Sequence, residues 1–100
     1  MVERKFSVND RLTNLRRELD SADAELLATL QRRFKIVEEI AVLKKENNLL
    51  ARDDVRWSQH MQAVESKAKE LTLPNGLVRT VFDAIHKHSL SLHKRMRKSK

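Results

Sequence analysis

Two basic residues in the N-terminal half of the chain, Arg33 and Lys44, have a spacing that suits the binding of one small anion. Lys44 follows Arg33 by 11 residues, which on an α-helix is ~1100° of rotation, within ~20° of a whole number of turns, and ~16 Å of rise. Arg33 also falls in a row of apolar residues, where an unpaired charge is costly. We therefore expect an anion to meet Arg33, either a small ligand held by both cations or the carboxylate of Glu38 or Asp53 in a salt bridge.

A third cation, Arg16, lies too far from Arg33 to reach the same ligand from the same chain. It precedes Arg33 by 17 residues, which is ~25 Å along a helix and ~100° around it. A two-fold dimer of antiparallel long helices would solve this, because each site would take Arg33 and Lys44 from one chain and Arg16 from the other.

Near the C-terminus, Ser89 and His93 are four residues apart and share one face of a helix. They can present a short and a long hydrogen-bonding group to the same cavity. Taken alone, Ser89 is also typical of a small packing residue, and His93 of an exposed position in a basic helix end.

The other histidines and the absence of cysteine argue against a metal site. His86 and His88 are about 200° apart on a helix, no pair of histidines has the HxxxH spacing, and we interpret both as part of a solvated tail. Without cysteine there is no thiolate ligand, disulfide or thiol nucleophile. We expect neither a metal nor a cofactor.

A long row of residues, spaced alternately three and four apart, predicts one helix from about residue 10 to about residue 46. The row consists of Leu12, Leu15, Leu19, Ala22, Leu26, Thr29, Arg33, Ile36, Ile40, Leu43, Asn47 and Leu50. No proline or glycine interrupts it, and such a helix would be ~55 Å long. Because it would project beyond a globule of 100 residues, we expect it to pack against a second copy of the chain.

Two shorter helices are predicted after the long one. The second covers about residues 54–71, with Asp53 or Asp54 placed to cap its N-terminus. The third covers about residues 74–96 and starts at Pro74, a residue that the first helical turn tolerates. A basic tail follows the third helix.

Composition supports an all-α fold of three helices in a single domain over residues 1–100. The chain has one glycine, one proline and 4% aromatic residues, which is too few turn-forming and aromatic residues for a sheet. No apolar run approaches the ~20 residues that cross a bilayer, and the N-terminus has no apolar signal segment. We expect a soluble, cytoplasmic protein without a membrane partner.

The formal charge of +7 is concentrated at the C-terminus. All 14 acidic residues lie at or before Asp83, where 15 basic residues nearly balance them, and six basic residues follow from Lys87 to Lys100. A basic helix end is more often solvated than used to read nucleic acid. We therefore consider nucleic-acid binding unlikely, although a non-enzymatic helical interaction or RNA-binding module stays an alternative.

Three segments together resemble the all-helical class of chorismate mutases, the type II superfamily. They are LRRELDSADAELLATLQRRFKIVEEIAVLKKE, then RDDVR, then LVRTVFDAIHKHSL, and the likeness covers roughly residues 12–95. The spacing of six residues fits the family's site without an insertion or deletion. They are Arg16, Arg33, Lys44, Asp53, Arg56 and Ser89.

The resemblance implies an intertwined homodimer of three-helix chains with two equivalent sites and no cofactor. The reaction it implies is the Claisen rearrangement of chorismate to prephenate, which needs no nucleophile. Arg33 and the partner subunit's Arg16 would hold the two substrate carboxylates. Lys44 would bind a carboxylate and the ether oxygen, where negative charge grows as the bond breaks.

The resemblance also assigns roles to residues of the second and third helices. Arg56 and Ser89 would complete the contacts to the carboxylates and the ring, and Asp53 would orient the ring hydroxyl, alone or in addition to capping its helix. The family commonly has a glutamine or glutamate as a second donor to the ether oxygen, where this chain has His93. An imidazolium donates more strongly than an imidazole, so with an ordinary pKa of ~6.5 we expect turnover to decline as pH rises through the titration of His93.

Trp57 is the second departure from the family pattern, because a glutamate usually stands in its place. Its indole N–H can donate a hydrogen bond but cannot accept one. Trp57 either packs against Leu49 and Leu50 or lines the pocket. In the second case the alternatives are an isochorismate-pyruvate lyase and a mutase of 4-amino-4-deoxychorismate. Whether the pathway is aromatic amino acid biosynthesis, by way of the shikimate pathway, or a specialised one stays open.

Overall fold

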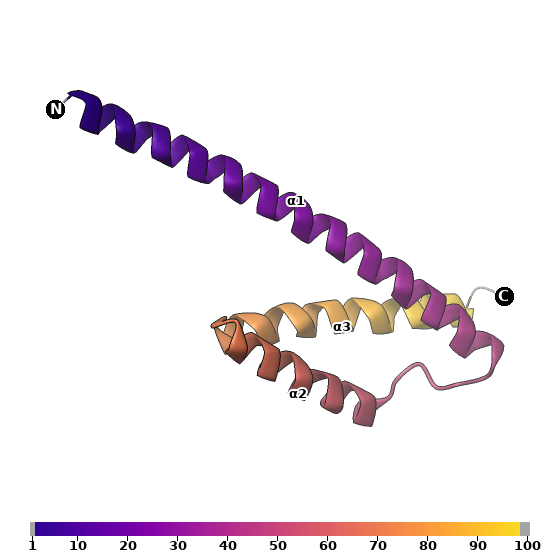
Figure 1. Ribbon diagram of the computed structural model, residues 1–100. Coiled ribbons are helices and arrows are strands. Elements are labelled where there is room, and N and C mark those ends of the chain that lie inside the picture. Colours follow the sequence, from indigo (N-terminus) through magenta and orange to yellow (C-terminus); the bar gives the residue numbers. More distant parts are fainter. Residues whose placement is uncertain (1, 99–100) are drawn as a thin grey trace. The chain divides into compact units, whose positions relative to one another are not determined.

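A computed structural model describes residues 2–98 of the chain and the side chains of residues 7–97. The described chain folds into three α-helices. Helix α1 spans Val2–Glu46, α2 spans Asp54–Glu70 and α3 spans Asn75–Lys98 (Figure 1). No strand occurs in residues 2–98. The prediction of an all-α chain with three helices and one very long N-terminal helix is confirmed.

Two helix starts differ from the predicted ones. Helix α1 begins at Val2 rather than near residue 10, since the first residues contain no proline or glycine that would stop it. Helix α3 begins at Asn75, and Pro74 precedes it. The carbonyl oxygen of Pro74 accepts a hydrogen bond from the amide of Val78 at 3.1 Å, so the proline stands at the entrance of the helix rather than inside it. Lys100, the end of the predicted basic tail, lies outside the described residues.

The chain divides into two compact units, Met1–Lys35 and Ile36–Lys100. The described part of the first unit consists of helix α1 alone. The second unit holds the end of α1, the loop of residues 47–53, and the helices α2 and α3. None of the helices in residues 2–98 is apolar over a length that would cross a membrane.

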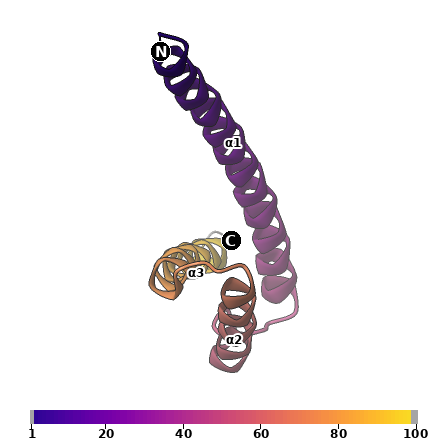
Figure 2. The ribbon, with the colours of Figure 1, turned by 60° about the vertical axis from the view of Figure 1, so that its left-hand side comes forward.

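Helices α2 and α3 form an antiparallel hairpin within the second unit (Figures 1 and 2). Met61 and Ala68 of α2 and Val78 of α3 are buried between them. Arg79 of α3 donates to a carboxylate oxygen of Glu65 of α2, which joins the two helices at the edge. This core is thin, because it consists of few and mostly small side chains.

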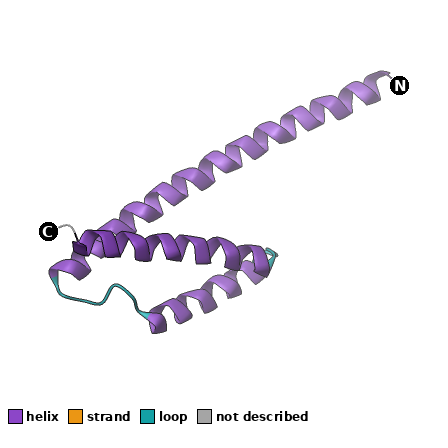
Figure 3. Cartoon of the chain, turned by 180° about the vertical axis from the view of Figure 1, so that it is seen from behind, coloured by secondary structure: helices purple, strands orange, loops and turns teal. Residues whose placement is uncertain are grey.

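A loop follows each of the helices α1 and α2 (Figure 3), and near the start of each loop one residue has the left-handed conformation. Asn48 has φ 56° and Thr72 has φ 59°. The next residue, Leu49 or Leu73, donates its amide to the carbonyl five residues back, at 2.8 Å and 2.9 Å. This is the Schellman arrangement, which satisfies the last carbonyls of a helix and sharply turns the chain. It therefore sets the directions in which the loop of residues 47–53 and helix α3 begin.

The part of α1 in the second unit buries a different face from the predicted apolar row. Ala41 is 2% exposed, whereas three residues of the row, Ile36, Ile40 and Leu43, are 48%, 42% and 58% exposed. The row continues toward the N-terminus with exposed leucines, among them Leu19. One face of α1 therefore leaves a long apolar edge in contact with solvent.

Candidate functional site

Lys44 lies near the end of α1, and its side chain is half-buried. Its ammonium donates to the carbonyl oxygen of Ala51 at 3.2 Å, across the loop of residues 47–53. The Schellman end of α1 turns this loop back toward the last turn of the helix, which brings Ala51 within reach. A cation bonded to a neutral carbonyl is held in place and keeps its charge available for an anion.

Ser89 and His93 lie on the buried face of α3. His93 is 6% exposed and Ser89 is buried as well, so the interpretation of His93 as an exposed helix end is wrong. The hydroxyl of Ser89 donates to the carbonyl oxygen of Ile85 at 3.0 Å, which suits a packing role. The Nδ1 atom of His93 is buried and has no hydrogen-bond partner among the described residues. A buried polar atom without a partner is costly, so this nitrogen is a natural contact for a ligand.

The electrostatic surroundings of His93 are positive. Burial lowers the pKa of His93 below its ordinary value of 6.5, and the charges of Lys44 and Arg97 lower it further. His93 is therefore a neutral imidazole near neutral pH, and the predicted pH effect moves below 6.5. The charge of Lys44 of α1 therefore acts on His93 of α3; that the two donate to one oxygen stays a prediction.

Arg97 is a residue that the sequence interpretation missed. Its guanidinium donates from Nη2 to the carbonyl oxygen of Leu49, in the same loop that receives Lys44. In the opposite direction, Lys45 donates to the carbonyl oxygen of Met96 at 2.8 Å. Arg97 follows His93 by four residues, and that spacing was the available signal for it.

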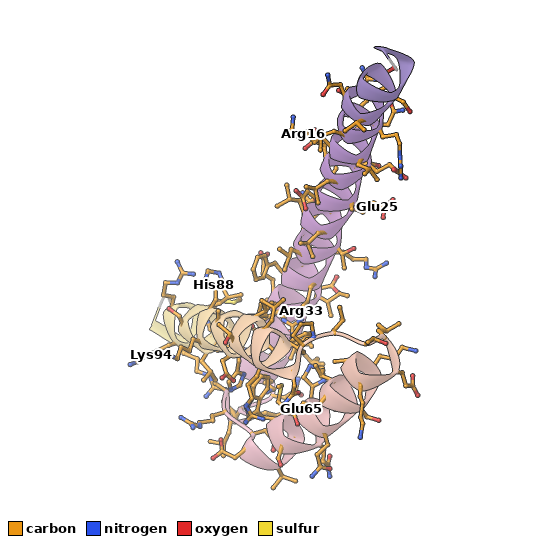
Figure 4. The ribbon with its side chains drawn as sticks, turned by 90° about the vertical axis from the view of Figure 1, so that its left-hand side faces the viewer. Arg16, Glu25, Arg33, Glu65, His88 and Lys94 are labelled. Atoms are coloured by element: carbon orange, nitrogen blue, oxygen red, sulfur yellow. The ribbon has the colours of Figure 1, made fainter. Side chains whose placement is uncertain are left out.

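Two of the predicted cations, Arg16 and Arg33, belong to the first unit. Both lie on α1, well apart along it (Figure 4), as their spacing of 17 residues requires. Arg33 is half-buried, its Nη1 atom has no hydrogen-bond partner among the described residues, and burial lowers its pKa. The salt bridge to Glu38 or Asp53 stays a prediction, as does the small anionic ligand. Arg16 is exposed.

Asp53 and Arg56 lie at the exposed start of α2. Asp53 is the N-cap, and its carboxylate accepts a hydrogen bond from the amide of Arg56 at 3.0 Å. The predicted cap is therefore present. No hydrogen bond or ion pair among residues 2–98 joins the side chain of Asp53 or Arg56 to Lys44 or His93.

Trp57 packs across the hairpin rather than against the loop. Its indole stacks on the imidazole of His86 of α3, with ring centroids 3.8 Å apart and an angle of 9° between the planes. The expected partners, Leu49 and Leu50, are 52% and 78% exposed. His86 is half-buried by this contact, so its assignment to a solvated tail is wrong.

Residues 15–94 match the family described as chorismate mutase type II. The matched segment is far more than half of the chain, and it includes every residue of the candidate site except Arg97. Comparison with curated proteins and with solved structures gives no match.

Proposed function

Because the chain belongs to the chorismate mutase type II family, whose members are mostly isomerases, we propose that it rearranges chorismate to prephenate. The observation that supports this most is that the positive charge of Lys44 acts on His93. Both are hydrogen-bond donors, they come from different helices, and the charges that act on His93 are cations. Such a place favours an anionic ligand whose negative charge grows during the reaction.

The proposed chemistry is a rearrangement within one substrate molecule. The enzyme holds the flexible dicarboxylate in the compact conformer in which the reacting carbons approach each other. Lys44 and His93 donate hydrogen bonds to the ether oxygen, whose negative charge increases as the carbon–oxygen bond breaks. A loss of one such donor commonly costs about 10²-fold or more in rate. At neutral pH His93 donates as a neutral imidazole, so Lys44 supplies the charged donor.

The proposed active molecule is an intertwined homodimer with two equivalent sites. Two features of α1 support it: the exposed apolar row, and the separation of Arg16 from Arg33 on one continuous helix (Figure 4). In this dimer Arg33 and Lys44 come from one chain and the partner subunit's Arg16 completes the site. The two arginines bind the substrate carboxylates, because a guanidinium matches a carboxylate in a two-bond geometry.

The remaining candidate residues have proposed roles around the ring of the substrate. Arg56 and Ser89 complete the contacts to the carboxylates and the ring, and Asp53 accepts a hydrogen bond from the ring hydroxyl. The Oδ1 atom of Asp53 already accepts a hydrogen bond from the amide of Arg56. A carboxylate has two oxygens and several lone pairs, so capping and substrate contact are compatible.

Trp57 favours a second candidate, an isochorismate-pyruvate lyase or a mutase of 4-amino-4-deoxychorismate. The indole has no acceptor for a ring hydroxyl, and its stack on His86 fixes it as a flat apolar wall between α2 and α3. Incubation of the purified protein with chorismate, isochorismate and the amino analogue separates these functions by their products. Turnover of isochorismate alone would replace the mutase assignment with the lyase. Turnover of none of the three compounds would refute the proposed enzymatic function.

Arg33→Ala provides the sharpest test of the proposed substrate contact. We expect turnover to fall by at least about 10²-fold, because a charge-assisted bond to a carboxylate is lost. The folded dimer should survive, since Arg33 is half-buried and its Nη1 atom has no hydrogen-bond partner among the described residues, so its removal breaks no bond of that atom. Steady-state kinetics, circular dichroism melting and sedimentation measure the three properties.

Arg32→Ala is the matched control, because Arg32 is the neighbouring arginine of the same helix and is exposed. Its turnover should stay within about twofold of the unaltered protein, as is usual for a surface substitution. If Arg33→Ala stabilises the protein and leaves turnover unchanged, Arg33 does not bind substrate.

A further inference from the structure

We infer that Arg97 is an additional substrate-binding residue, a cation that contacts a carboxylate of the chorismate-like ligand from the last turns of α3. The inference rests on the proposed function, and it adds to the site a residue that lies beyond the segment matched to the family.

Arg97 shares a face of α3 with two residues of the candidate site. Ser89, His93 and Arg97 are spaced four residues apart, so they form one line along a single face of α3. The first two are buried and the third is half-buried. The line therefore runs from two buried positions of α3 to a partly exposed one, where a long side chain can bind a ligand and still meet solvent.

The present bond of Arg97 is one that a ligand can replace. Arg97 donates to the carbonyl oxygen of Leu49, a neutral acceptor. A guanidinium has five N–H donors, and its bonds to carboxylates are roughly twice as strong as its bonds to neutral groups. A carboxylate that enters beside Leu49 would therefore gain a stronger bond from Arg97, whether in addition to the carbonyl or in place of it.

Among the described residues, neither Lys44 nor Arg97 has a hydrogen bond or salt bridge to an acidic side chain. Lys44 bonds to the carbonyl oxygen of Ala51 and Arg97 to that of Leu49, so two cations meet the same loop through neutral acceptors. Both charges act on His93, whose Nδ1 atom is buried without a partner among the described residues. Two cations that act on an unpaired buried nitrogen are compensated when a dianion binds.

The alternative role for Arg97 is a purely structural one. Together with the bond from Lys45 to Met96, its bond to Leu49 fastens the end of α3 to the loop after α1. The two roles differ in what a substitution at Lys45 does. Lys45→Met removes the bond to Met96 and leaves Arg97 in place. Only a structural role therefore predicts the same result for Lys45→Met and Arg97→Ala.

The test is the dissociation constant for prephenate, the dicarboxylate product, measured by calorimetry for the full chain. Arg97→Ala should weaken prephenate binding by at least about tenfold, the usual effect of losing a charge-assisted hydrogen bond. Arg97→Lys should recover part of the loss. In steady-state kinetics Arg97→Ala should raise KM by a similar factor and change kcat by less than about threefold, because the contact is present before and during the reaction.

Lys45→Met and Lys94→Ala are the controls. Lys94 is exposed on the same helix (Figure 4), so its removal changes the net charge equally without removing a contact. Both controls should bind prephenate within about twofold of the unaltered protein. Unchanged binding in Arg97→Ala, or an equal loss in either control, would overturn the inference. If the unaltered protein binds prephenate but does not turn over chorismate, the proposed function is refuted and the effect of Arg97→Ala on binding still decides the role of Arg97. If the unaltered protein does not bind prephenate, the inference is overturned.

Discussion

His93 shows how burial redefines the chemistry of a single side chain. As a residue of a basic helix end it would titrate near its ordinary pKa, but it is buried and faces the charges of Lys44 and Arg97. All three causes disfavour the imidazolium, so the pKa moves down. In the proposed mutase, the donor that occupies the usual glutamine position therefore changes its strength only in acid.

The pH profile of kcat/KM should carry the signature of this residue. The imidazolium donates more strongly than the imidazole, so kcat/KM should increase as pH falls through a pKa that lies below 6.5. The pH dependence of kcat/KM reports the pKa values of the free enzyme, so the lowered pKa of His93 applies to it. His93→Gln should remove the increase, and steady-state kinetics between about pH 5 and 8 measure it.

Unfolding provides a second measurement of the same pKa. Below pH 6.5 the unfolded chain binds a proton at His93 before the folded chain does, so the free energy of unfolding decreases as the pH is lowered. The fall is at most about 1.4 kcal/mol per pH unit from this group. It should be smaller in His93→Gln, as followed by urea unfolding. An identical rate, pH profile and acid sensitivity in the two proteins would exclude this role for His93.

At the scale of the helices, the ends depend on residues that carry little signal in the sequence. A left-handed residue after a helix is usually glycine, but the only glycine of this chain, Gly76, has no positive φ. Thr72 takes the left-handed conformation although it is β-branched, which makes it a strained position. The fold accepts this strain because the hairpin of α2 and α3 requires the turn.

Thr72→Gly should therefore stabilise the protein. Relief of the left-handed strain contributes ~1–2 kcal/mol, and the greater freedom of glycine in the unfolded chain costs ~0.5–1 kcal/mol. We expect a net gain of about 0.5–1 kcal/mol in the free energy of unfolding. Urea unfolding at one fixed protein concentration measures it.

Thr80→Gly is the contrasting variant, because Thr80 lies inside α3 and donates its hydroxyl to the carbonyl oxygen of Gly76 at 2.9 Å. A glycine there should destabilise the helix, since glycine has the lower helix propensity. Stabilisation by Thr80→Gly, or none by Thr72→Gly, would contradict the strain at Thr72.

The existence of the helices was predictable, whereas their contacts were not. Their number follows from the apolar spacing and from the rarity of proline and glycine. Periodicity identifies a face only to within one residue, so it did not reveal that Ala41 is buried while Ile40 is exposed. For the same reason it placed His86 in solvent, although the stack with Trp57 covers it.

At the scale of the whole molecule, helix α1 has many large apolar residues that the described chain leaves exposed. The exposed row includes Leu12, Leu15, Leu19 and Leu26. Exposed apolar patches of this kind on a protein surface commonly mark a site of association. A second copy of the chain would cover the row, and the small core of the hairpin would then be supplemented by the interface.

The sequence also predicted which site residues cannot meet on one chain, because helix geometry fixes the distance from Arg16 to Arg33. It could not predict the contacts of Lys44, which depend on the path of the loop of residues 47–53. Loop paths follow from turn conformations such as that of Asn48, and no spacing rule reveals these. The residue-level expectations were therefore soundest within single helices.

The placement of Arg16 and Arg33 on one helix has a genetic consequence in the proposed dimer. Arg16→Ala and Arg33→Ala should each inactivate both sites of a homodimer. When the two inactive proteins are unfolded together and refolded, a mixed dimer has one site with both substitutions and one site with neither. Half of the dimers are mixed on random pairing, so activity should return to about a quarter of the normal value. Two alleles that fail alone would thus complement each other, and a mixture that stays inactive would show that each site is built from a single chain.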